Sequence, residues 1–277
     1  MSRVLTSTGR QFGHLTLLLA ACCALGPIGL LVMNAFKPHI DIVSNPLAPP
    51  TRLYVHNFVA AWTEGHFATG LVNSLLLCGS TVAIVLVTGS MAAYPLARSP
   101  TRLWRSIALY FLCSITVPIQ LFLFPLYFVF AKLHLLGNVF GTSVILAAIN
   151  LPLSIFLLRT YILTIPPELD DAAVLDGASP FQVFWHVVFP LMRPGLATVG
   201  AIVCLAVWNE FLITSTFQQG EKNFTMTLGY RAMNGSISDD QGFLMAGGLI
   251  VIVPILLVFL ATRRFIIDGM TSGAVKG

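Results

Sequence analysis

Residues 166–190 read PPELDDAAVLDGASPFQVFWHVVFP. This stretch is too acidic and too rich in proline to cross a membrane like the apolar segments on either side of it. Pro167 and Glu168 suit the start of a helix, because proline fits the first turn and carboxylates favour the positive end of the helix dipole. Gly177 is expected to end that helix, since glycine adopts a left-handed cap without steric cost. The stretch therefore predicts a water-exposed helix that another molecule contacts.

A second short helix is expected directly after the first. Ser179 and Pro180 suit its start, by the same capping arguments. Apolar side chains then follow at i, i+3, i+4 and i+7, which places them on one helical face: Phe181, Phe184, Trp185 and Val188. The pattern predicts two helices joined by a glycine turn, lying between two membrane spans.

Composition predicts an all-α membrane protein. The chain is 56% hydrophobic and 9% charged, far below the roughly 25% charged residues of soluble domains. Long apolar segments are each close to the roughly 20 residues that cross a bilayer. We expect one transmembrane domain over residues 1–277 with six spans, at about 15–36, 70–94, 106–131, 138–158, 195–217 and 242–263, a cytoplasmic loop at 160–193 and a tail at 268–277.

The positions of the positive charges predict the orientation, since loops rich in Lys and Arg tend to stay in the cytoplasm. With the N-terminus inside, ten of the 15 Lys and Arg residues are internal, namely Arg3, Arg10, Arg98, Arg102, Arg105, Arg159, Arg193, Arg263, Arg264 and Lys276. The other five are external: Lys37, Arg52, Lys132, Lys222 and Arg231. Both termini and the loop at 166–190 are therefore expected in the cytoplasm.

The loop at 166–190 resembles a known motif. Asp171-Ala172-Ala173, three residues, Gly177, nine residues and then Val187-Val188-Phe189-Pro190 is similar to the E-A-A-x3-G-x9-I-x-L-P loop of ABC importer permeases. Further segments resemble the carbohydrate-importing, MalG-like branch of that family: Asn73-Ser74, residues 92–98 (AAYPLAR), Trp208-Asn209-Glu210-Phe211 and residues 273–277 (GAVKG). The resemblance covers nearly the whole chain and implies the type I importer permease (MetI-like) fold, with cytoplasmic coupling helices.

The resemblance also implies partners and a location. It predicts a multi-pass subunit of the bacterial inner membrane that imports a sugar, polyol or glycosylated solute. A second, MalF-like permease subunit, two ATPase subunits and an extracytoplasmic solute-binding protein are its expected partners, besides membrane lipid, and no nucleic acid is expected. ATP and Mg²⁺ are expected on the ATPase and no cofactor in this chain. A non-sugar solute, such as a phosphate ester, is the alternative within the same architecture.

Two groups of residues are expected to contact the ATPase. The coupling loop supplies the first group: Glu168, Asp171, Ala172, Ala173, Asp176, Gly177 and Pro190. The C-terminal tail supplies the second, because the matching tail of MalG-like relatives extends along the ATPase subunits: Gly273, Ala274, Val275, Lys276 and Gly277.

The expected translocation path rests on Trp208, Asn209 and Glu210. Charged groups within spans are expensive and often mark a pathway, and an aromatic face with an amide suits sugar rings. The path is one of two interpretations, and the other, which we favour, is that Asn209 and Glu210 only hydrogen-bond between helices and hold the bundle together. Because Glu210 is the one acid in a predicted span, an ion-coupled secondary transporter is less favoured, yet it stays the alternative from another class.

Motifs of catalysis are missing from the sequence. No G-x4-G-K-[ST] phosphate loop, H-E-x-x-H pair or G-x-S-x-G elbow occurs. The histidines have no metal-ligand spacing. We expect no catalytic residues and no metal site in this chain, and ATP hydrolysis on a separate subunit.

Two segments that we expect on the external side each allow more than one interpretation of their role. Residues 37–66 suggest a short amphipathic helix around Asn57, Phe58 and Trp62, with structural support as its favoured role. The resemblance implies that the loop at 218–241 faces the binding protein, whereas a plain connector is the other interpretation.

Overall fold

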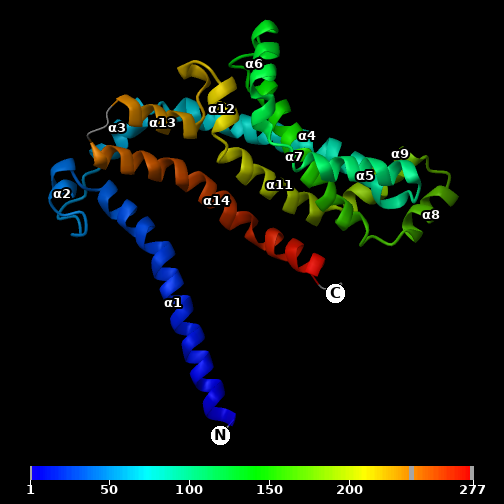
Figure 1. Cartoon of the computed structure of the whole chain (residues 1–277), viewed down its shortest axis with the longest axis horizontal. Coiled ribbons are helices and arrows are strands. Elements are labelled where there is room, and N and C mark those ends of the chain that lie inside the picture. The colour runs from blue at the N-terminus through cyan, green and yellow to red at the C-terminus, as the bar shows by residue number, and fades with distance from the viewer. Residues whose placement is uncertain (1, 237–239, 275–277) are drawn as a thin grey trace. The chain divides into compact units, whose positions relative to one another are not determined.

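The computed structural model describes residues 2–236 and 240–274, and this part of the chain is helical without any strand. Figure 1 shows the helices in chain order. They are α1 (Ser2–Ala35), α2 (His39–Ser44), α3 (His56–Glu64), α4 (Phe67–Arg98), α5 (Arg102–Ser114), η1 (Ile119–Phe122), α6 (Leu123–Lys132), α7 (Val139–Ile162), α8 (Glu168–Leu175), α9 (Pro180–Val183), η2 (Phe184–Val188), α10 (Phe189–Leu191), α11 (Arg193–Trp208), α12 (Leu212–Phe217), η3 (Glu221–Asn223), α13 (Met226–Ser236) and α14 (Gln241–Ala274).

The chain forms two compact units, residues 1–67 with 230–253, and residues 68–229 with 254–277. In the first unit, the buried Asn57 of α3 fastens its helix to the end of α1. Its amide donates to the carbonyl oxygens of Ala35 at 2.9 Å and Lys37 at 2.8 Å. These carbonyls would otherwise lack a helical partner, so Asn57 gives residues 37–66 the supporting role expected for them.

The second unit is built around α7, which packs against α11, α5 and α12. The contact between α7 and α11 needs a glycine. A Cβ atom at Gly195 would lie 2.5 Å from the ring of Tyr161, closer than any side chain permits. Small residues at such positions let two membrane helices approach each other.

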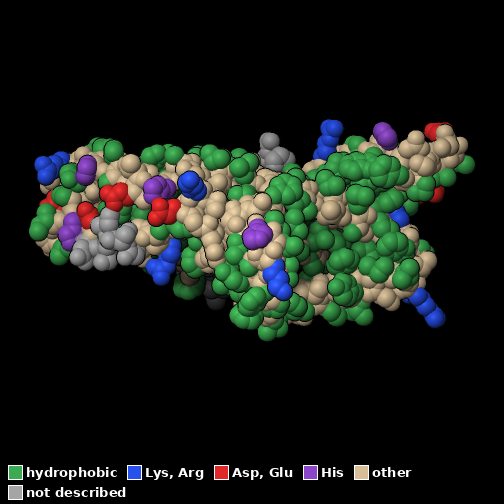
Figure 2. Space-filling view, turned by 90° about the horizontal axis from the view of Figure 1, so that it is seen from above, with side chains coloured by type: hydrophobic (Ala, Val, Ile, Leu, Met, Phe, Trp, Pro, Cys, Tyr) green, Lys and Arg blue, Asp and Glu red, His purple; other side chains and the backbone are tan. Residues whose placement is uncertain are grey.

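Four helices are long and apolar enough to cross a membrane, at Gln11–Ala35, Phe67–Arg98, Val139–Ile162 and Gln241–Arg263. Two bent pairs raise the number to as many as six if each pair is one span. Hydrophobic side chains cover wide areas of the surface in Figure 2, as a lipid-facing protein requires.

The third expected span is strongly bent. Its two halves, Arg102–Ser114 and Ile119–Lys132, meet at 89°. Pro118 lies at the bend and precedes η1. Proline lacks an N–H and disfavours a helical conformation in the residue before it, which explains why the apolar run does not form one straight helix.

The fifth expected span, 195–217, is also interrupted, since α11 ends at Trp208 and α12 begins at Leu212. Proline does not interrupt every span, since α7 continues through Pro152. Hydropathy predicts which segments are apolar, but it does not predict where the helix path breaks.

Candidate functional site

The first helix of the loop at 166–190, α8, forms as its termini predict. Its first turn carries Glu168, Asp170 and Asp171, where carboxylates favour the helix dipole. Gly177 follows the helix with φ of +87°, and a Cβ atom there would meet nothing within 4 Å. The backbone angle, rather than lack of space, is therefore the reason for glycine at this turn.

The second helix begins with a capping box. The Ser179 side chain accepts from the N–H of Gln182 at 3.4 Å, and the Gln182 side chain accepts from the N–H of Ser179 at 2.8 Å. Beyond Val183 the helix widens into the π-helix η2, so the α-helical face predicted from spacing is only partly formed. Phe184 and Val188 are buried, but Phe181 is 63% exposed.

The outer face of α8 combines carboxylates with exposed apolar side chains. Leu175 is 87% exposed, Val174 56% and Leu169 42%. The residues expected to couple to the ATPase mostly share this exposure: Glu168, Asp171, Ala172, Asp176 and Gly177 are exposed, whereas Ala173 and Pro190 are half-buried. We call this exposed surface of α8 the docking face. Figure 1 shows α8 and α9 next to each other.

Asp170, which lies in the acidic first turn and is not among the residues predicted to couple to the ATPase, holds α8 on α4. Its carboxylate accepts from the Tyr94 hydroxyl at 2.9 Å and from Arg98 Nε and Nη2 at 3.0 and 3.2 Å. The side chains of Arg98 and Asp170 are only 16% and 13% exposed. Tyr94 and Arg98 are four residues apart in the AAYPLAR segment, and this spacing, which puts both on one helical face, was the available signal.

The tail that is expected to contact the ATPase, residues 273–277, lies mostly outside the described residues. The backbone of Gly273 and Ala274 belongs to the end of α14. Val275, Lys276 and Gly277 lie outside the described residues, as do the side chains of the whole tail from 268 onward.

Glu210 caps a helix at the break in the fifth expected span. Its carboxylate accepts from the N–H of Ile213 at 2.9 Å and of Thr214 at 3.0 Å. These are among the first N–H groups of α12, which have no partner within the helix. These hydrogen bonds join Glu210 to residues only three and four positions later in the chain. They therefore cap α12 and do not hold two separate helices of the bundle together.

Asn209 and Trp208 lie on the other side of the same break. The exposed Asn209 side chain donates to the Leu205 carbonyl at 2.8 Å within its own helix. Trp208 is 5% exposed, and its carbonyl accepts from Thr227 Oγ1 at 3.1 Å. The three expected path residues are thus adjacent, but only Asn209 presents an exposed polar side chain.

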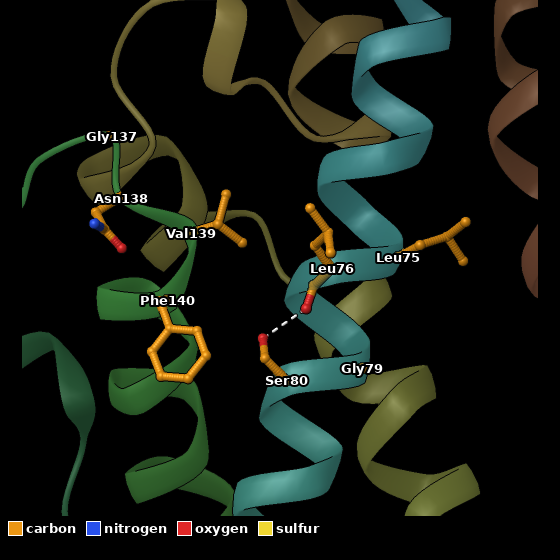
Figure 3. Close-up of a pocket in the computed structure, with 8 residues that line it drawn as sticks. All are labelled: Leu75, Leu76, Gly79, Ser80, Gly137, Asn138, Val139 and Phe140. Carbon is orange, nitrogen blue, oxygen red and sulfur yellow. Dashed lines mark hydrogen bonds between the residues drawn. The ribbon is translucent and has the colours of Figure 1, made fainter.

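Two cavities occur in the second unit. Figure 3 shows the smaller, about 550 Å³, between α4 and the start of α7, with Ser80 and Asn138 among its lining residues. Ser80 Oγ already bonds to the Leu76 carbonyl at 2.5 Å and to Ser143 Oγ at 2.6 Å, and the Asn138 side chain accepts from Gly141 N–H at 2.9 Å. The side-chain polar groups of Ser80 and Asn138 are therefore already hydrogen-bonded to residues of α4 and α7.

The larger cavity, about 850 Å³, lies inside the bend of α5, η1 and α6 against α7. Its lining is mainly apolar, and Asn150, the amide in it, donates to the Leu146 carbonyl at 2.8 Å. Within residues 2–236 and 240–274, no group of three or more His, Cys, Asp or Glu side chains could hold a metal ion.

Residues 85–266 match the model of the binding-protein-dependent transport system inner membrane component. The chain belongs to this family. It is a permease of an ABC importer, and the matched residues include the coupling loop and the helix break at 209–211.

Two relatives and one solved structure are similar over nearly the whole permease. The melibiose/raffinose/stachyose import permease MelC of Bacillus subtilis is 31% identical over 95% of this chain and 96% of its own. The diacetylchitobiose uptake permease NgcG of Streptomyces coelicolor is 30% identical over 100% of this chain and 93% of its own. A bacterial ABC transporter that imports alginate has a TM-score of 0.76 at 21% identity, covering 93% and 97% of the two chains. The all-α type I importer permease fold is thereby confirmed.

Proposed function

We propose that the docking face of this permease binds a separate ATPase subunit and receives the movement that drives import. The exposed side chains of Leu169, Val174 and Leu175 carry this proposal. They share one short helix with the exposed carboxylates of Glu168 and Asp171, and the exposed Asp176 follows directly after it. These charges make the surface unsuited to contact with lipid. Exposed apolar groups rimmed by charges are typical of a protein interface.

The remaining assembly follows from the family. The permease pairs with a second, MalF-like subunit in the bacterial inner membrane, with both of its termini in the cytoplasm. Two ATPase subunits bind ATP and Mg²⁺, and a binding protein delivers the solute from outside. Closure of the ATPases moves the coupling loops and turns the permease pair from inward-open to outward-open. The tail Gly273–Gly277 adds a second contact with the ATPase.

The solute is an oligosaccharide. The named cargo of MelC and of NgcG consists of short sugars, which supports a sugar over a phosphate ester. The two cavities described above have mainly apolar linings, which supports a sugar site between this permease and its partner subunit. The exposed amide of Asn209 contributes to that path, the buried Trp208 supports it from behind, and Glu210 shapes it by capping α12.

Co-purification tests the docking face. Leu175→Ser removes its most exposed apolar side chain, and Leu47→Ser is the matched control, because Leu47 is 70% exposed but lies between α2 and α3. We expect an ATPase to co-purify with the tagged native chain and with Leu47→Ser, and to be depleted with Leu175→Ser. Gly177→Pro, which is incompatible with φ of +87°, should also lose or uncouple it. No ATPase with the native chain would refute the proposal.

Uptake assays test the solute and the energy source. Cells that express the complete transporter should accumulate labelled raffinose or diacetylchitobiose, and glycerol 3-phosphate should not compete. Uptake should persist when an uncoupler collapses the proton gradient while ATP is maintained. Competition by the phosphate ester would favour the non-sugar alternative. Strict dependence on the gradient would favour the ion-coupled transporter.

A further inference from the structure

Helix α4 is anchored at both of its ends to loops that lie outside the membrane. At one end, Asp170 of α8 binds Tyr94 and Arg98 through three hydrogen bonds of 2.9–3.2 Å. We call these three residues the Asp170 clamp. The two nitrogens of Arg98 each face a different carboxylate oxygen, and this paired arrangement fixes orientation as well as distance.

Two further contacts stiffen the same end. Arg159 of α7 donates from Nε to the Leu96 carbonyl at 2.9 Å, which lies in the last turn of α4 where helical partners are missing. The ring of Tyr94 lies 5.5 Å from that of Phe184 in η2. The end of α4 is therefore joined to α7, to α8 and to the second loop helix, and α8 cannot move far without moving α4.

At the other end, one face of α4 holds the segment 222–226. The Asn73 side chain donates to the carbonyls of Lys222 and Phe224, both at 2.9 Å. The buried Ser74 hydroxyl accepts from the Met226 N–H at 3.0 Å. A Cβ atom at Gly70 would lie 3.3 Å from the Met226 nitrogen. Residues 70, 73 and 74 share one helical face by spacing, and this face grips the loop's backbone.

The length of α4 between its two anchors is close to the thickness of the membrane's hydrocarbon core. Twenty residues separate Ser74 from Tyr94, which is about 30 Å along a helix, the thickness of the hydrocarbon core. The helix is unbroken between them, and its one proline, Pro95, follows Tyr94. A continuous hydrogen-bonded helix moves as a rod, so displacement of one anchor displaces the other.

We infer that the Asp170 clamp makes α4 the mechanical link between the coupling loop and the external segment 222–226. Tyr94, Arg98 and Asp170 are positioning residues in this inference, which rests on the proposed function because the ATPase supplies the movement. Movement of α8 is passed through the clamp to α4, and through Asn73 and Ser74 to the segment 222–226.

Cysteine labelling tests the link without knowledge of the solute. Lys222 has an exposed side chain, and only its backbone binds Asn73, so Lys222→Cys leaves the anchor intact. The complete complex in nanodiscs is labelled with a membrane-impermeant maleimide, with and without Mg·ATP, and labelling of the five native cysteines is subtracted. We expect ATP to change the labelling rate at residue 222 in the otherwise native complex.

Substitutions distinguish a specific loss of the Asp170 clamp from a general loss of folding. Asp170→Asn and Arg98→Gln should abolish the ATP-dependent change while the ATPase still co-purifies, and Tyr94→Phe, which removes one hydroxyl, should reduce it. Asp170→Glu keeps the charge and should retain it. Glu64→Gln and Arg105→Gln, which alter exposed charges elsewhere, should behave like the native complex.

Three results would overturn the inference or its basis. An unchanged ATP response in Asp170→Asn would show that the clamp does not transmit movement. A native complex that contains the ATPase but shows no response at residue 222 would also refute the link through α4. Failure of any ATPase to co-purify with the native chain would instead refute the proposed function, so the two failures are distinguishable.

Discussion

Glu210 illustrates how a charged group in an apolar segment gains a structural role. The backbone leaves the helix at 209–211, and the carboxylate accepts the N–H groups of Ile213 and Thr214. The partial positive charge of a helix start favours a carboxylate there. The half-buried carboxylate is thus satisfied by backbone N–H groups of the next helix.

A substitution series at Glu210 separates capping from proton coupling. Glu210→Gln retains one acceptor oxygen, so we expect uptake to stay within a few-fold of native. Glu210→Ala leaves the N–H groups without their acceptor and should lower stability by about 0.5–2 kcal/mol, the usual cost of a lost cap. The midpoint of thermal unfolding and the initial uptake rate measure the two effects. Complete loss of uptake in a stable Glu210→Gln protein would contradict the capping role.

At the scale of the element, the loop 166–190 is a set of short helices with two different faces. Asp170 points to α4, while Val174 and Leu175 remain exposed. Helices of this length are marginal alone, so α8 depends on its contacts with α4 and η2. One face is anchored, and the other remains available for a partner.

Packing between α7 and α11 leads to a second test. Gly195→Ala would place a methyl group against the root of the Tyr161 ring, which cannot swing aside easily, and we expect destabilisation of about 1–3 kcal/mol. Gly79→Ala is the matched control, because a Cβ atom there meets nothing within 4 Å. Its effect should be neutral or slightly stabilising. Thermal unfolding of the purified proteins provides the comparison, and equal midpoints would contradict the close approach.

At the scale of the whole molecule, the distribution of charge predicts which loops face the cytoplasm. Single cysteines at exposed positions can test this in intact cells. Arg52→Cys and Lys132→Cys should react with an impermeant maleimide, whereas Arg105→Cys should react only after the membrane is permeabilised. Background from the native cysteines is measured in parallel. The reverse pattern would place the docking face outside and exclude a cytoplasmic ATPase as its partner.

Much of this permease follows from its sequence alone. Apolar segments of membrane length, the acidic helix start at Glu168 and the caps at Gly177 and Ser179 are local patterns. They predict an all-α membrane protein of this family. Local chemistry is sufficient there because a helix satisfies its backbone hydrogen bonds within a single segment.

Only the tertiary structure decided which residues meet. The bend at Pro118, the break at 209–211 and the widening at η2 depend on competition between backbone partners that hydropathy does not register. Asp170 and Asp171 are neighbours of the same type, yet only Asp170 reaches Tyr94 and Arg98, more than 70 residues earlier in the chain. Contacts at that separation depend on how helices pack, and no local pattern in the sequence contains that information.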